Sequence, residues 1–93
     1  MLKTFELLAT GWQLDTDTGT YSYLLEDDDI TSSVRVDILP DVSLYKAMIK
    51  DLVTGVYTTN DNGVVSVVCI DAAFKENLTV SAHFVKIDEF FAY

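Results

Sequence analysis

Apolar and polar residues alternate along much of this chain, which is the pattern of strands that bury one face and leave the other in water. In segment 30–39, Val34, Val36 and Ile38 are separated by polar residues. Segment 64–70 is almost wholly apolar, which indicates a strand in the middle of a sheet. The predicted strands are residues 4–10, 20–26, 30–39, 56–59, 64–70 and 78–87.

Segment 42–54 has a different period, because its apolar residues come in adjacent pairs four positions apart. The pairs are Leu44 with Tyr45, Met48 with Ile49, and Leu52 with Val53. This spacing predicts an amphipathic helix with one wide apolar face. Asp41 is expected to cap its N-terminus, and Gly55 is expected to end it.

These segments predict a single domain, residues 1–93, of the α+β class. A mostly antiparallel sheet of five to six strands would carry the helix on one face, in the order β-β-β-α-β-β-β. The turn between the two strands after the helix is expected at residues 60–63, since Asn-Gly is a strong hairpin signal.

The charge is strongly negative, with 15 acidic and 6 basic residues and a formal net charge of −9. Phosphate backbones and anionic lipid surfaces attract the opposite sign, so neither nucleic acid nor a membrane is an expected partner. The first residues lack the apolar core of a signal peptide, because Lys3 and Glu6 interrupt it. We therefore expect a protein made in the cytoplasm and not secreted by a signal peptide.

Acidic residues are concentrated between positions 15 and 29, where no lysine or arginine occurs. They are Asp15, Asp17, Glu26, Asp27, Asp28 and Asp29. They would keep the chain soluble through self-repulsion, or they would form a surface that docks a basic partner or mimics nucleic acid. Asp15, Asp17 and Glu26 are also a weak calcium candidate, but the flanking segments read as strands, and a turn between strands explains the same residues.

Two single residues could take part in catalysis, but neither has a partner at a recognisable spacing. His83 is expected to face solvent on the last strand, and Cys69 is expected in the core. The sequence therefore predicts no catalytic residue, no cofactor and no enzymatic activity.

The last four positions contain three aromatic residues, Phe90, Phe91 and Tyr93. Such side chains are costly to leave in water. They are expected to fold back on the chain's own sheet or to dock on a neighbouring subunit or partner.

The order of short motifs resembles small modules encoded near the tail-fibre and baseplate genes of phages that infect Gram-positive bacteria. The motifs are Gly11-Trp12, Tyr21-Ser22-Tyr23-Leu24, Ile30-Thr31, Val34-Arg35-Val36-Asp37-Ile38, Gly63-Val64-Val65-Ser66-Val67 and Asn77-Leu78-Thr79-Val80. The resemblance implies a virion-associated or accessory phage protein with a structural or attachment role. It carries over no catalytic residue.

The first hypothesis is therefore a non-enzymatic structural or adsorption module that acts through protein–protein contacts, as a homo-oligomer or as a component of a phage particle. The alternative is a small acidic inhibitor that binds a basic host protein of the nucleic-acid-binding kind. The partner-binding residues would be the six acids between positions 15 and 29, together with Phe90, Phe91 and Tyr93. Clustering of the acids on one face would favour the inhibitor, and scatter would favour the module.

Overall fold

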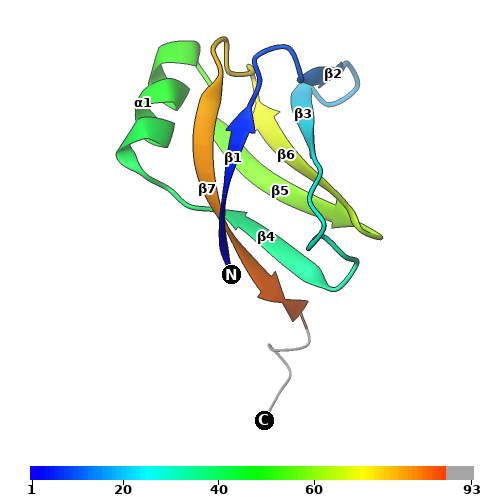
Figure 1. Ribbon diagram of the computed structural model, residues 1–93. Coiled ribbons are helices and arrows are strands. Elements are labelled where there is room, and N and C mark those ends of the chain that lie inside the picture. Colours follow the sequence, from blue (N-terminus) through cyan, green and yellow to red (C-terminus); the bar gives the residue numbers. More distant parts are fainter. Residues whose placement is uncertain (88–93) are drawn as a thin grey trace.

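The computed structural model describes residues 1–87, which form seven strands and one helix (Figure 1). The elements are β1 (Leu2–Leu7), β2 (Gln13–Asp15), β3 (Thr20–Leu25), β4 (Val34–Ile38), α1 (Val42–Asp51), β5 (Gly55–Asp61), β6 (Val64–Ile70) and β7 (Leu78–Lys86). The α+β class and the antiparallel pairing are confirmed. Four strands, and not three, precede the helix, because the short strand β2 pairs with β3.

The strands form two sheets, where the sequence predicted one. The three-stranded sheet has the order β1-β7-β4, and the four-stranded sheet has the order β2-β3-β6-β5. The predicted apolar residues of β4, Val34, Val36 and Ile38, face the core between the sheets, and β6 takes the predicted interior position. The most deeply buried side chains are Leu7, Val36, Val65, Val67, Cys69 and Ala82.

The two sheets meet where β4 lies beside β5. Side chains of β5 make the connection: the Thr58 hydroxyl donates to the carbonyl of Val36, and the Asn60 amide donates to the carbonyls of Val34 (2.6 Å) and Thr31 (2.8 Å). These bonds satisfy carbonyl groups that an unpaired strand edge would leave open.

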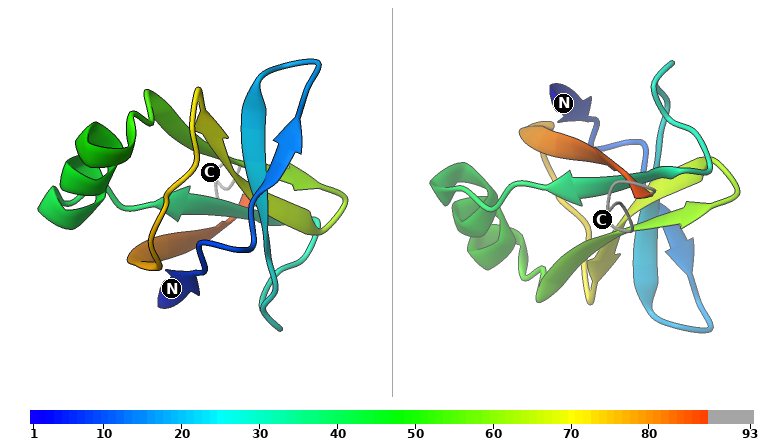
Figure 2. Two further views of the ribbon diagram at one scale, coloured as in Figure 1. Left: turned by 90° about the horizontal axis from the view of Figure 1, so that it is seen from above. Right: turned by 90° about the horizontal axis from the view of Figure 1, so that it is seen from below.

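The helix is capped as predicted, since the carboxylate of Asp41 accepts a hydrogen bond from the backbone N–H of Leu44 at 2.8 Å. Its end differs from the prediction: Leu52 takes the left-handed C-cap conformation with φ of 61°, and Gly55 is the first residue of β5. The end views show α1 beside the strands and not across the face of a sheet (Figure 2).

The helix packs against β7 and against the loop between β6 and β7. Leu44 is its buried apolar residue, and the buried carboxylate of Asp51 accepts a hydrogen bond from the backbone N–H of Lys75 at 3.0 Å. Met48 also packs against the core, whereas Ile49, its neighbour in the predicted apolar stripe, is exposed. Within residues 1–87, no helix is long and apolar enough to cross a membrane.

Candidate interaction surfaces

The acidic residues predicted as one surface lie in two groups. Asp15 ends β2 and Asp17 lies in the turn that follows, whereas Glu26 and the three aspartates after it follow the other end of β3. A six-residue strand separates the groups by about 20 Å. The acids are therefore scattered over two ends of a strand and do not form one continuous patch.

The first group forms a tight turn. The carboxylate of Asp15 accepts a hydrogen bond from the backbone N–H of Asp17 at 3.0 Å, and its carbonyl accepts one from Gly19. Gly19 has a φ of +69°, a conformation that glycine adopts easily. Because Glu26 lies beyond the far end of β3, it does not join Asp15 and Asp17 in a calcium loop. Among residues 1–87, no cluster of three or more His, Cys, Asp or Glu side chains could hold a metal ion.

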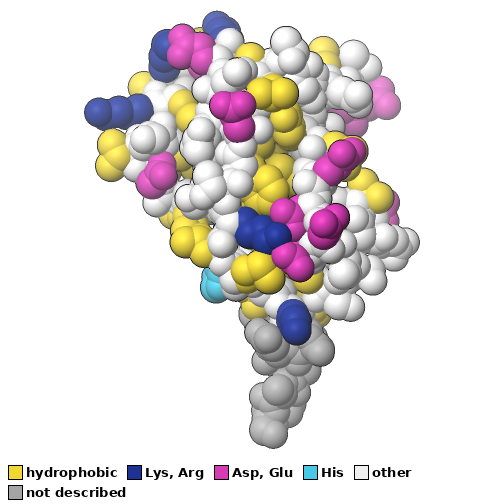
Figure 3. Space-filling model, in the orientation of Figure 1, with side chains coloured by type: hydrophobic (Ala, Val, Ile, Leu, Met, Phe, Trp, Pro, Cys, Tyr) yellow, Lys and Arg dark blue, Asp and Glu magenta, His cyan; other side chains and the backbone are white. Residues whose placement is uncertain are grey.

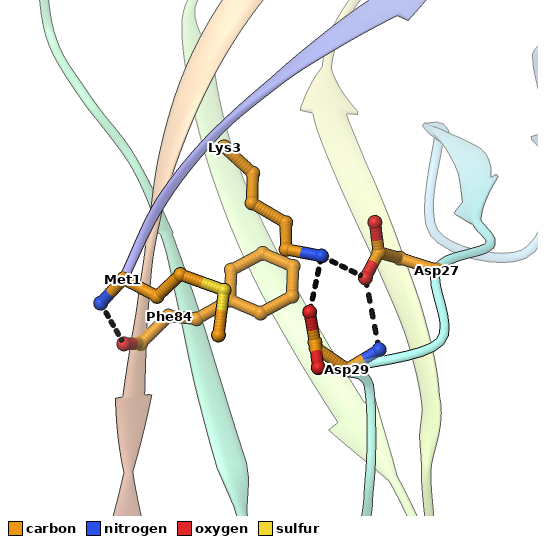
Figure 4. Close-up of polar contacts among 5 residues, drawn as sticks. All are labelled: Met1, Lys3, Asp27, Asp29 and Phe84. Carbon is orange, nitrogen blue, oxygen red and sulfur yellow. Dashed lines mark hydrogen bonds and ion pairs between the residues drawn. The ribbon is translucent and has the colours of Figure 1, made fainter.

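The second group is partly neutralised by Lys3 from β1 (Figure 4). The Lys3 ammonium lies 2.6 Å from a carboxylate oxygen of Asp27 and also pairs with Asp29. The same oxygen of Asp27 accepts the backbone N–H of Asp29 at 2.9 Å. The Lys3 side chain passes over the ring of Phe84, with its nitrogen 5.5 Å from the ring centre. These contacts join β1 to the loop before β4.

The Lys3 contact changes the proton affinity of both partners. The hydrogen bond from Lys3 is the largest cause that lowers the pKa of Asp27, and the hydrogen bond from the backbone N–H of Asp29 is the second. The carboxylates of Asp27 and Asp29 in turn raise the pKa of Lys3. Figure 3 shows a basic side chain bordered by acidic ones on the face of the molecule that carries β1. Two of the carboxylates proposed for partner binding thus have a structural partner already.

The two candidate catalytic residues lie on different sheets, Cys69 on β6 and His83 on β7. Cys69 is fully buried on the inner face of β6, and burial raises the pKa of its thiol to about 12. His83 is exposed on β7, between the buried residues Ala82 and Phe84, so its side chain leaves the opposite face of that sheet. Both placements match the sequence prediction. They do not bring the Cys69 thiol and the His83 imidazole together as a nucleophile and a base.

Two exposed apolar surfaces were not predicted from the sequence, and the first is the exposed half of the helix. Val42, Tyr45, Ile49 and Leu52 are 67%, 54%, 77% and 73% exposed. Their spacing of three, four and three residues places them in one row, which we call the helix ridge. The amphipathic pattern revealed these residues, but their exposure follows from the position of α1 beside the strands.

A second surface is the outer face of the four-stranded sheet. It carries the outward residues of β2, β3, β6 and β5, with Leu24 (50% exposed), Tyr57 (46%), Val64 (57%) and Ile70 (37%) as its large apolar members. We call this surface the outer sheet face. The alternation in β3 and β5 indicates one exposed face, but the sequence does not show that these four side chains stay exposed among residues 1–87.

The predicted partner residues Phe90, Phe91 and Tyr93 lie outside the described residues. Comparison with known proteins found no match to a family model, to a curated protein or to a solved structure.

Proposed function

We propose that this chain is a non-enzymatic structural or adsorption module of the phage type, which acts through protein–protein contacts. The observation that carries the proposal is the helix ridge, with four large apolar side chains more than half exposed, three of them in the helix and the fourth, Leu52, at its C-cap. Contiguous exposed apolar surface on a small protein is typical of a protein interaction site.

The helix ridge has the geometry that an apolar groove or a second helix recognises. Residues three and four apart lie on one side of a helix, and such rows are the anchors of helix-in-groove binding. The helix is well anchored on its other side, since Leu44 and Asp51 are buried and Lys50 pairs with Glu76 at 2.7 Å. A rigidly held ridge loses little conformational entropy on binding, which favours affinity.

The acidic-inhibitor hypothesis has less support. A nucleic-acid mimic needs a continuous row of free carboxylates, but these acids occupy both ends of β3, and Lys3 holds Asp27 and Asp29. The acidic groups fit the simpler role of keeping the chain soluble.

Incorporation into particles tests the proposed function. A tagged chain would be produced in bacteria that encode it, and phage particles purified from them would be probed for the tag. We expect the wild-type chain in the particles, and we expect the Ile49→Asp variant to be lost from them. Leu14→Asp is the matched control, because Leu14 is 53% exposed on β2 and lies outside the ridge.

Absence of the wild-type chain from particles would overturn the phage assignment. Equal incorporation of the Ile49→Asp variant and the wild type would show that the helix ridge is not the contact. Circular dichroism of both variants would establish that they fold, as expected for substitutions at exposed positions.

A further inference from the structure

The turn between β5 and β6 consists of Asn62 and Gly63, a pair of residues prone to spontaneous loss of the asparagine amide. Asp61 pairs with Val64, so these two residues alone form the turn. Their φ angles of 52° and 91° are typical of a type I′ hairpin turn. Asn62 is exposed, and its side chain makes no hydrogen bond within residues 1–87, so water reaches its amide group.

The reaction uses the backbone nitrogen of Gly63 and needs no enzyme. Hydroxide removes the N–H proton, and the nitrogen attacks the side-chain carbonyl carbon of Asn62. A new C–N bond closes a five-membered imide ring, and the amide group leaves as ammonia after taking a proton from water. A second water molecule opens the ring at one of its two carbonyl carbons, which leaves aspartate or isoaspartate at position 62. Glycine favours this attack because it has no side chain that hinders the approach.

The fold restrains the nitrogen that must attack. The backbone N–H of Gly63 donates a hydrogen bond to the side-chain oxygen Oδ1 of Asn60 at 2.8 Å. While this bond is present, the proton is shielded from hydroxide and the orientation of the peptide plane is fixed. The reaction therefore requires that the Asn60 side chain release Gly63 first.

The Asn60 side chain is itself held at its other end. Its amide nitrogen donates to the carbonyls of Val34 (2.6 Å) and Thr31 (2.8 Å). The turn also lies against the loop before β4, since a Cβ built on Gly63 would be 3.5 Å from the backbone nitrogen of Ser32. Release of Gly63 thus requires that the hairpin turn part from this loop.

The other two asparagines of the chain differ from Asn62 in both respects. Asn60 uses its amide in the bonds described above, and Asn77 accepts the backbone N–H of Ala9 at 2.9 Å. Each is followed by a residue whose side chain hinders attack by the next nitrogen. The reaction is therefore expected at Asn62 and not at the other two.

We propose that Asn62-Gly63 is a site of spontaneous deamidation and isoaspartate formation, and that the Asn60 side chain restrains this reaction in the folded chain. Isoaspartate inserts one more carbon into the backbone of a two-residue turn and adds a negative charge. The Gly63 N–H then no longer fits the Asn60 oxygen, so the modification weakens the contact between β4 and β5. This site is separate from the helix ridge, and the inference does not depend on the proposed function.

Incubation of the purified chain in mildly alkaline buffer tests the proposal. Peptide mapping by mass spectrometry locates the modified residue, and an isoaspartate-specific methyltransferase with labelled methyl donor counts the isoaspartate formed. We expect modification at Asn62, slow in native buffer and faster in concentrated urea. Asn60→Ala should raise the native rate about fivefold, the factor expected for the loss of one hydrogen bond.

Two variants separate local release of Gly63 from global unfolding. Leu44→Ala removes a buried side chain of α1, which lies at the opposite end of the molecule from the β5–β6 turn (Figures 1 and 2). It should lower stability but leave the rate at Asn62 unchanged, because nearly all molecules remain folded. Asn62→Gln should give no isoaspartate in the same time, because glutamine would have to form a larger ring.

Three results would overturn the proposal. No modification of Asn62 in urea would remove the site itself. Equal native rates for the wild type and Asn60→Ala would remove the restraint, and an equally fast Leu44→Ala would assign the effect to global unfolding.

Hydrogen exchange decides the question on the wild-type chain if Asn60→Ala does not fold. The Gly63 amide should exchange more slowly than the same amide in an unstructured peptide, because its N–H is donated to Asn60. Exchange at the rate of the unstructured peptide would overturn the restraint.

Discussion

The side chain of Asn60 closes the gap between the two sheets by donating a hydrogen bond to the carbonyl of Val34 at 2.6 Å. The same amide nitrogen also reaches the carbonyl of Thr31, and the amide oxygen accepts the backbone N–H of Gly63 at 2.8 Å. One side chain thus joins β4, the loop before it and the β5–β6 turn.

We expect Asn60→Ala to lower the free energy of unfolding by about 1–3 kcal/mol, because partly buried backbone groups lose their partners. Urea unfolding followed by the fluorescence of Trp12, the single tryptophan, measures the change. Thr59→Ala is the matched control: Thr59 is the exposed neighbour on the opposite side of β5, and its effect should stay within about 0.5 kcal/mol. Equal effects of the two substitutions would refute a bridging role for Asn60.

Lys3 should give the stability of the protein a dependence on pH at both ends of the range. The pKa of Asp27 is lowered from 3.8, so its contribution is present above about pH 4 and is lost as the pH falls through the folded-state value. The pKa of Lys3 is raised from 10.5, so its contribution is present below that pH and is lost as the pH rises through the higher folded-state value.

The difference in melting temperature between the wild type and Lys3→Met should therefore be largest near neutral pH and shrink toward both extremes. The groups are partly exposed, so the difference should be modest and should decrease with added salt. Lys50→Met, which removes the more exposed pair with Glu76, should show a smaller difference. Parallel melting curves for the wild type and Lys3→Met across the pH range would contradict the role given to Lys3.

The strands were predictable because their signal is local. Burial of one face produces a period of two, and the segments around Val36 and Val80 show it clearly. Strand β2 was missed because three exposed residues contain no period to detect. Asn60 was assigned to a turn, since asparagine favours turns, whereas its bonds to β4 depend on an approach of two sheets that no local pattern encodes.

The surfaces were harder to predict for the same reason. The pairs Leu44–Tyr45 and Met48–Ile49 form one apolar stripe in sequence, but the position of the helix beside β7 buries Leu44 and leaves Tyr45 and Ile49 exposed. Likewise, the acids between positions 15 and 29 are close in sequence, but an extended strand between them separates the two groups. Closeness in sequence implies closeness in space only when the connecting segment turns back.

Cys69 should be unreactive in the folded protein. Burial raises the pKa of its thiol to about 12, so on the order of 10⁻⁴ of it is thiolate at pH 8, and no solvent reaches it. A thiol-reactive disulfide reagent should label the native chain slowly and the chain in concentrated urea rapidly. Rapid and complete labelling without urea would contradict the packing of β6.

A substitution at Leu52 should affect the stability of the fold and the proposed binding role of the helix ridge in opposite directions. It ends the helix with φ of 61°, a conformation that favours glycine, and its side chain is 73% exposed, so it contributes little to the core. We expect Leu52→Gly to raise the free energy of unfolding by about 0.5–1 kcal/mol, measured by urea unfolding. Because the substitution removes a residue of the helix ridge, it should also weaken incorporation into particles.

Ile49→Ala, the control, should weaken incorporation without a comparable gain in stability, since Ile49 lies in regular helix. A Leu52→Gly variant that is less stable than the wild type would show that the Leu52 side chain supports the fold, and would remove it from the ridge.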